Sequence, residues 1–138
     1  MTASAAAFDD RDPEPALVDA WRTLLARQAA TACALDRELN EHHGLGMSEF
    51  EVLERLVEAT AGDCNASLRV QELAASVHLS QSALSRLIAR LEKADLVARS
   101  MCAEDRRGVS VCLTPAGRDR HTAARPTHRA VLASMLDG

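Results

Sequence analysis

The chain has 138 residues, of which 47% are hydrophobic and 26% are charged, and its formal net charge is −4. This length and balance predict one globular domain and exclude a disordered or fibrous chain. No apolar run approaches the roughly 18 residues of a membrane span, and the start of the chain lacks the basic stretch of an export signal. We therefore expect a cytoplasmic protein without a membrane contact, whose four cysteines stay as thiols.

Charge is distributed unevenly along the chain. Residues 1–80 carry 6 basic and 14 acidic residues, whereas residues 81–129 carry 10 basic and 5 acidic ones. A local concentration of cations attracts a polyanion even when the total charge is negative. The second half of the chain therefore favours nucleic acid as a partner.

The first predicted elements are an arm and a long helix. Residues 1–12 are small and acidic, which predicts a disordered N-terminal arm. A helix is then predicted over 16–43, because apolar residues recur there at steps of three, four and seven. These residues are Leu17, Trp21, Leu24, Leu25, Ala32, Leu35 and Leu39. So long an apolar stripe, with little chain to cover it, predicts a partner subunit.

Three shorter helices are predicted in the middle of the chain. Ser48 and Glu51 have the spacing of a capping box and predict a helix that ends near Ala59, followed by a polar loop. A helix over 70–77 and a turn over 78–80 follow. Ser80 is then the predicted N-cap of a helix that begins at Gln81. Its inward stripe is Leu84, Leu87, Ile88 and Leu91.

The hydrophobic period then changes to about two, which predicts strands over 96–99 and 109–113 around a polar tip. Thr114 as N-cap and Pro115 at the first helical position open a last helix, which Pro126 is expected to kink or break. The predicted fold class is mostly α with a small β wing, a winged helix-turn-helix with flanking dimerisation helices. Within a domain over 13–138, the helix-turn-helix covers 69–94, the wing 96–114, and the flanking helices 16–43 and 115–136.

The helix that begins at Gln81 has an outward face suited to reading DNA. Its short and polar side chains permit close approach to base edges in a major groove, and the predicted major-groove residues are Gln81, Ser82, Ser85 and Arg86. The predicted phosphate contacts are Ser80, Arg90 and Lys93. Such a face is also compatible with an ordinary solvated helix.

The tip of the predicted hairpin carries the second set of DNA contacts, Asp105, Arg106 and Arg107. An arginine on a protruding loop fits a narrow minor groove, and a neighbouring carboxylate holds it in one rotamer. A solvated charged turn is the alternative, but a basic wing that follows a helix-turn-helix is less often accidental.

Together these segments resemble the multiple-antibiotic-resistance regulator (MarR) family over residues 16–130. The residues that carry the resemblance are 69–99 and 104–117, with Asp105 and Arg107 as the Asp-x-Arg motif of the wing. The resemblance implies a homodimeric transcription regulator that binds pseudo-palindromic double-stranded DNA, often a repressor released by a small-molecule effector or by oxidation. It also implies dimerisation through the first and last helices. Family members usually continue into a further helix, so we expect part of the usual interface to be missing.

The sequence indicates the effector of this protein less clearly than it indicates DNA binding. Cys102 and Cys112 are candidate redox sites and predict an alternative, thiol-oxidation-sensing regulator, whereas Cys33 is expected to be buried and inert among alanines. Trp21 and Phe50 are expected to belong to the core. No metal or other cofactor is expected.

The sequence favours two other classes of protein less than a regulator. An enzyme is not expected, because the sequence contains no metalloprotease, dithiol, nucleophile-elbow or P-loop motif. A winged-helix protein-interaction module without DNA binding is the other alternative. It predicts an acidic or apolar face where this chain has Gln81, Arg86 and Arg90.

Overall fold

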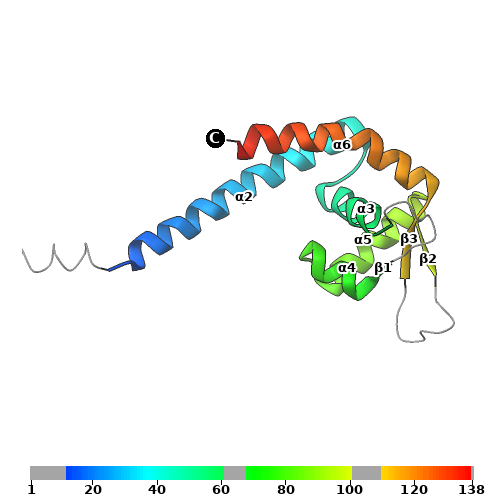
Figure 1. Cartoon of the computed structure of the whole chain (residues 1–138), viewed down its shortest axis with the longest axis horizontal. Helices are drawn as coiled ribbons and strands as arrows, with labels where there is room; N and C mark the ends of the chain where they lie inside the picture. The colour runs from blue at the N-terminus through cyan, green and yellow to red at the C-terminus, as the bar shows by residue number, and fades with distance from the viewer. Residues whose placement is uncertain (1–11, 61–67, 101–109, 138) are drawn as a thin grey trace, which may run out of the picture.

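The structure is a computed structural model and describes residues 12–60, 68–100 and 110–137. The elements within these ranges are α2 (Glu14–His43), α3 (Met47–Thr60), β1 (Leu68–Arg69), α4 (Val70–Val77), α5 (Gln81–Lys93), β2 (Val97–Ser100), β3 (Ser110–Leu113) and α6 (Pro115–Leu136) (Figure 1). The mostly helical fold with a small wing sheet is thus confirmed. Except for Asp12, which accepts a hydrogen bond from the Glu14 amide at 2.9 Å, the predicted arm lies outside the described residues.

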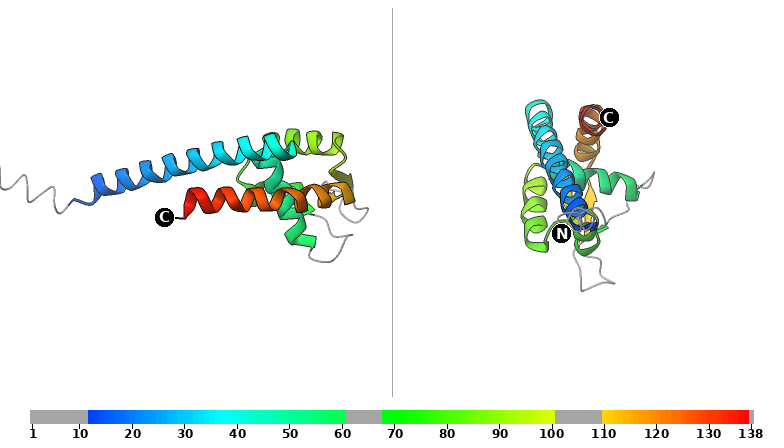
Figure 2. Two further views of the ribbon diagram at one scale, coloured as in Figure 1. Left: turned by 90° about the horizontal axis from the view of Figure 1, so that it is seen from above. Right: turned by 90° about the vertical axis from the view of Figure 1, so that its left-hand side faces the viewer.

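The long helix α2 extends beyond the part of the chain that covers it. α6 lies beside its C-terminal half, while its N-terminal half projects away from the body (Figures 1 and 2). Leu35 and Leu39 are accordingly buried, whereas Leu17, Trp21 and Leu24 are 65%, 59% and 62% exposed. Although α2 has 30 residues, no helix in the described ranges is long and apolar enough to cross a membrane.

The sheet contains a strand that the sequence analysis did not predict. Its order is β1-β3-β2, and both pairings are antiparallel. β1 consists of only Leu68 and Arg69, which pair with Val111 and Ser110. Two residues are too few to show an alternating pattern, so this strand depends on the pairing that β3 offers across the fold.

Two of the three predicted helix caps are confirmed. The Ser80 hydroxyl accepts from the Ala83 amide at 3.1 Å, and the Thr114 hydroxyl accepts from the Gly117 amide at 3.0 Å.

The predicted capping box of Ser48 and Glu51 is wrong, because α3 begins at Met47. The capping contacts form two residues before the predicted position, at the amides of Gly46 and Met47. Glu49 accepts from the Gly46 amide at 2.6 Å, and Asp36 of α2 accepts from the Met47 amide at 3.0 Å.

One hydrophobic core joins the helices to the sheet. Its most deeply buried apolar side chains are Leu39, Leu45, Phe50, Val52, Leu53, Leu56, Leu73, Leu84, Ile88, Leu91, Val97 and Val111. Of the two outcomes expected at Pro126, a kink or a break, the break does not occur, because α6 runs as one helix from Pro115 to Leu136; the helix bends along its length in Figure 1. The break was a local expectation, and packing of α6 along α2 and α3 holds the helix through the proline.

Asp95 provides a test of backbone strain next to the wing. Its φ of 63° lies in the left-handed region, which costs a residue with a Cβ about 1 kcal/mol, less for aspartate. We expect Asp95→Gly to raise the free energy of unfolding by about 0.5 kcal/mol in urea denaturation. Ala94→Gly is the matched control: φ at Ala94 is −83°, so glycine there should destabilise the protein. Equal effects of both changes would contradict the strain at Asp95.

Candidate nucleic-acid interface

Two helices and a tight turn form the framework of the site. α4 ends at Val77, and the chain reverses through His78, Leu79 and Ser80 before α5 begins. His78 takes a left-handed conformation with a φ of 59°, and its amide donates to the Ala74 carbonyl. α4, this turn and α5 lie within the 69–94 segment for which the sequence predicts a helix-turn-helix.

α5 is divided into a buried and an exposed face. Leu84, Leu87, Ile88 and Leu91 are at most 4% exposed, as the sequence predicts. The opposite side carries every predicted contact of this segment, and all of them are exposed: Ser80, Gln81, Ser82, Ser85, Arg86, Arg90 and Lys93. The predicted major-groove and phosphate residues are thus brought together on one surface.

Arg86 and Arg90 line a cavity of about 500 Å³ on this surface, opposite Asp36 and Glu49. Both carboxylates already accept hydrogen bonds from amides at the start of α3. Within the described part of the chain, neither arginine forms an ion pair. Their guanidinium groups therefore remain available to acceptor atoms of a ligand.

Arg99 is a candidate that the sequence analysis missed. From β2, its guanidinium donates to the Ser85 carbonyl at 3.3 Å and pairs with Glu92 at 3.4 Å. It therefore places a cation beside the exposed face of α5 and ties that helix to the wing. Strand alternation could have identified Arg99 from the sequence. Arg99 stands two residues after the buried Val97, so the two side chains lie on the same face of β2.

The tip of the wing lies outside the described residues, and with it Asp105, Arg106, Arg107 and Cys102. The two strands that lead to the tip are described, and they pair from Val97 opposite Leu113 to Ser100 opposite Ser110.

The described cysteines and Trp21 differ in part from expectation. Cys112 alternates with the buried Val111 and Leu113 as predicted, and its thiol is half-buried and contacts the Ala98 carbonyl. Cys33 is exposed rather than buried, because α6 covers the neighbouring Ala34 and Leu35 and leaves Cys33 on the open side. Phe50 is in the core as expected, but Trp21 is not, because it lies on the projecting half of α2.

Several known proteins are similar to this chain in both sequence and fold. The sequence model of the MarR family matches residues 45–109. The regulator AbsC from Streptomyces coelicolor is 35% identical, with a TM-score of 0.74, over 84% of this chain and 75% of AbsC. Sco3205 from the same organism, solved in complex with DNA, is 30% identical, with a TM-score of 0.77, over 90% of this chain and 74% of that one.

Bordetella bronchiseptica BpsR, whose DNA binding is regulated by 6-hydroxynicotinic acid, shares the fold at 22% identity. Its TM-score is 0.72, over 87% of this chain and 86% of BpsR. No curated protein matches the sequence. The identity to AbsC and Sco3205 over most of each chain, together with the helix-turn-helix, leads to one conclusion: this protein belongs to the MarR family and is a DNA-binding transcriptional regulator.

Proposed function

We propose that this regulator is a repressor that binds pseudo-palindromic promoter DNA as a homodimer and is released by a small ligand. The observation that carries the proposal is the division of α5 into a buried apolar face and an exposed polar face. The major groove of DNA is about 12 Å wide and admits a helix that is held from behind in this way.

Base reading is assigned to the first two turns of α5. Ser82 and Ser85 are short enough to allow close approach, and Gln81 and Arg86 carry donors that reach base edges. Arg86 pairs with guanine most effectively, because its two donors match the two acceptors on that base.

Phosphate contacts surround this face and orient the helix in the groove. Arg90 and Lys93 lie in the last turn of α5, where a cation also complements the helix dipole. Ser80 lies at the N-terminus of α5, and Arg99 is added from β2. At the wing, Asp105, Arg106 and Arg107 are assigned to the minor groove by their sequence and by the resemblance.

The homodimer is supported by the apolar side chains on the projecting half of α2. Leu17, Trp21, Leu24 and Leu25 are 45–65% exposed in a single chain and follow one helical face. Full burial of such side chains stabilises an assembly by about 1.5–3 kcal/mol each. Two copies joined here present two α5 helices to two half-sites, which explains a pseudo-palindromic operator.

Release by a ligand is supported by a cavity of about 410 Å³ between α2, α3 and α6. Leu35, Met47 and Leu132 give it apolar walls, and Glu51 and Arg55 give it polar groups. A ligand there contacts both the dimerisation helices and the DNA-binding lobe, so it favours one arrangement of the two over the other. The ligand-regulated BpsR has the same fold.

The test is fluorescence anisotropy with duplexes from upstream of the protein's own gene and a scrambled duplex. Preference for one duplex is expected to survive at about 0.15 M salt, where backbone-only binding weakens steeply. Arg86→Ala should lower affinity for the preferred duplex by about 10- to 100-fold and affinity for the scrambled duplex much less.

Arg125→Ala is the matched control, since it removes the same charge from the exposed surface of α6 and should change either affinity by less than about twofold. Equal losses on both duplexes for Arg86→Ala would reassign Arg86 to a phosphate contact. Absence of binding at low salt would contradict the proposed function and favour an interaction module.

A further inference from the structure

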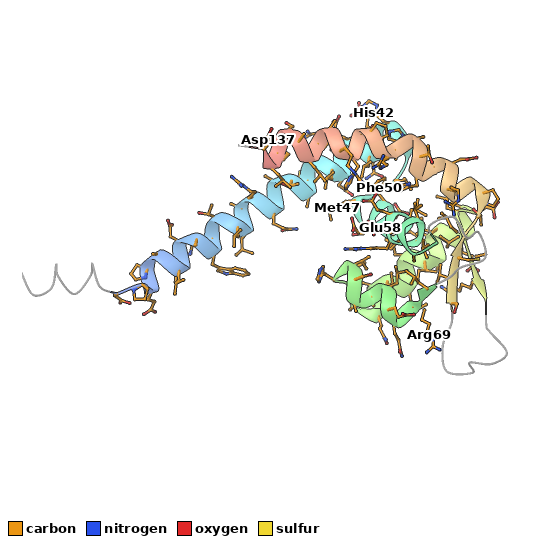
Figure 3. The ribbon with its side chains drawn as sticks, in the orientation of Figure 1. His42, Met47, Phe50, Glu58, Arg69 and Asp137 are labelled. Carbon is orange, nitrogen blue, oxygen red and sulfur yellow. The ribbon has the colours of Figure 1, made fainter. Side chains whose placement is uncertain are left out.

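A polar cluster lies where α6 packs on α3, and its members are buried except for Arg129, whose side chain is 40% exposed. It consists of Phe50 and Glu54 from α3 and of His121, His128 and Arg129 from α6. Figure 3 labels Phe50, which lies where α3 meets α6. Glu54, His121 and His128 are only 9%, 5% and 6% exposed. The Phe50 ring is stacked between the two imidazoles, with centroids 5.1 Å from His121 and 4.4 Å from His128. Titratable groups thus occupy a contact that apolar side chains would fill at lower cost.

Glu54 is the centre of the cluster. Arg129 donates to both of its carboxylate oxygens, at 2.8 and 3.0 Å, and the nearest nitrogen of His121 lies 3.0 Å away. Burial alone would raise the pKa of Glu54, but the hydrogen bonds from Arg129 and His121 outweigh burial and lower it. The carboxylate therefore stays charged and joins α3 to two residues of α6.

The position of His128 requires its neutral form. Its Nδ1 lies 2.6 Å from a guanidinium nitrogen of Arg129. Since a guanidinium can only donate, Nδ1 must be the unprotonated acceptor. Burial lowers the pKa of His128; Glu54 opposes this, and Arg129 and His121 reinforce it. A proton on Nδ1 would abolish the hydrogen bond and bring two cations together.

A protonated His128 has an alternative partner close by. The imidazole also lines the cavity of about 410 Å³, together with Glu51 and Glu58. Acceptor atoms of Glu51, Glu54 and His128 lie within 4.8 Å of one another. Burial raises the pKa of Glu51 despite the nearby Arg55, so a cation that enters the cavity would stabilise its carboxylate. The structure thus holds His128 against Arg129, and a protonated imidazole would find the carboxylates of Glu51 and Glu54 within reach.

We propose that His128 is a proton-sensitive lock between α6 and α3, and that its protonation loosens the DNA-binding lobe and weakens operator binding. The proposal rests on the proposed function, because α2 and α6 carry the dimer contacts while α3 belongs to the lobe with α4 and α5. The charged and titratable groups around His128 come from α3 and α6, whereas α2 and α4 contribute apolar Leu35 and Val77. These groups are Glu51, Glu54, Arg55, Glu58, His121 and Arg129.

The direction of the effect follows from linkage. Burial of His128 against Arg129 holds its pKa below the ordinary value of about 6.5. Protons therefore bind preferentially to any arrangement of the protein that frees the imidazole. Neutral His128 stabilises the packing of α6 on α3 in full when the pH is above this ordinary pKa. That stabilisation is lost as the pH falls from the ordinary pKa towards the lowered one. DNA binding is therefore expected to weaken below about pH 6.5.

The experiment compares operator affinity at pH 7.5 and 5.5 for the full chain and three variants at constant ionic strength. His128→Gln keeps an acceptor for Arg129 but cannot titrate. The wild-type protein is expected to lose more affinity than this variant, by up to about tenfold, which is the limit for one proton that binds with an ordinary pKa of about 6.5. His42→Gln, which removes an exposed histidine of α2, should behave as the wild type does. The assignment is overturned if His128→Gln retains the wild-type pH dependence, or if His121→Gln alone removes it.

A second measurement on the protein without DNA separates this proposal from the proposed function. Hydrogen exchange of amides in α3 and α6, corrected for intrinsic rates, should accelerate at pH 5.5 in the wild type but not in His128→Gln. Protein that does not bind DNA at pH 7.5 contradicts the proposed function, and the exchange measurement still decides the lock. Identical exchange in both proteins at both pH values would overturn the lock.

Discussion

Replacement of Gly117 by alanine is expected to lower the free energy of unfolding by about 3 kcal/mol, although it adds only one methyl group. A Cβ at this position would overlap the carbonyl oxygen of Leu96 and lie 3.1 Å from a methyl carbon of Leu113. The carbonyl cannot move easily, because it accepts a hydrogen bond from the Thr114 amide at 3.2 Å. The start of α6 must therefore shift away from the wing.

Urea denaturation followed by circular dichroism measures this loss. Gly46→Ala is the matched control, because the atoms nearest to its added Cβ belong to the flexible side chains of Glu49 and Asp36. We expect that variant to lose less than about 1 kcal/mol. If both variants lose the same amount, the close approach of α6 to Leu96 does not limit stability.

Substitution of Leu24 by glutamate on α2 is expected to convert the proposed dimer into monomers. Leu24 is 62% exposed in one chain and lies with Leu17 and Trp21 on the apolar face. A charge there must be desolvated when two copies associate, which costs several kcal/mol. Sedimentation or light scattering at micromolar concentration measures the molecular mass, and operator affinity should fall at least 100-fold because each monomer reaches one half-site.

Ala26→Glu is the control for this experiment. Ala26 is exposed two residues further along α2, so its side chain points about 200° away from that of Leu24. The control should remain a dimer with unchanged operator affinity. A Leu24→Glu protein that stays dimeric would show that the apolar face of α2 is not the interface.

The site could be predicted only as far as local patterns reach. The exposed face of α5 follows from a 3.6-residue period and from the cap at Ser80, both of which depend on neighbours within a few residues. Arg99 was missed because its role depends on contact with Ser85 and Glu92, which a strand reaches only after it packs on the helix.

The sequence by itself determined the order and type of the main elements, the helix-turn-helix and the long apolar stripe of α2. Hydrophobic period and capping are short-range, so they act on α4 and α5 almost independently of the rest of the chain.

Only the tertiary structure decided the pairing of Leu68 with Val111, the capping of Met47 by Asp36 and the burial of Glu54 between His121 and Arg129. Each of these joins residues distant in sequence, and each forms because packing of the core brings otherwise unsatisfied polar groups within hydrogen-bonding distance. The hydrophobic periodicity of a short segment does not predict such long-range contacts.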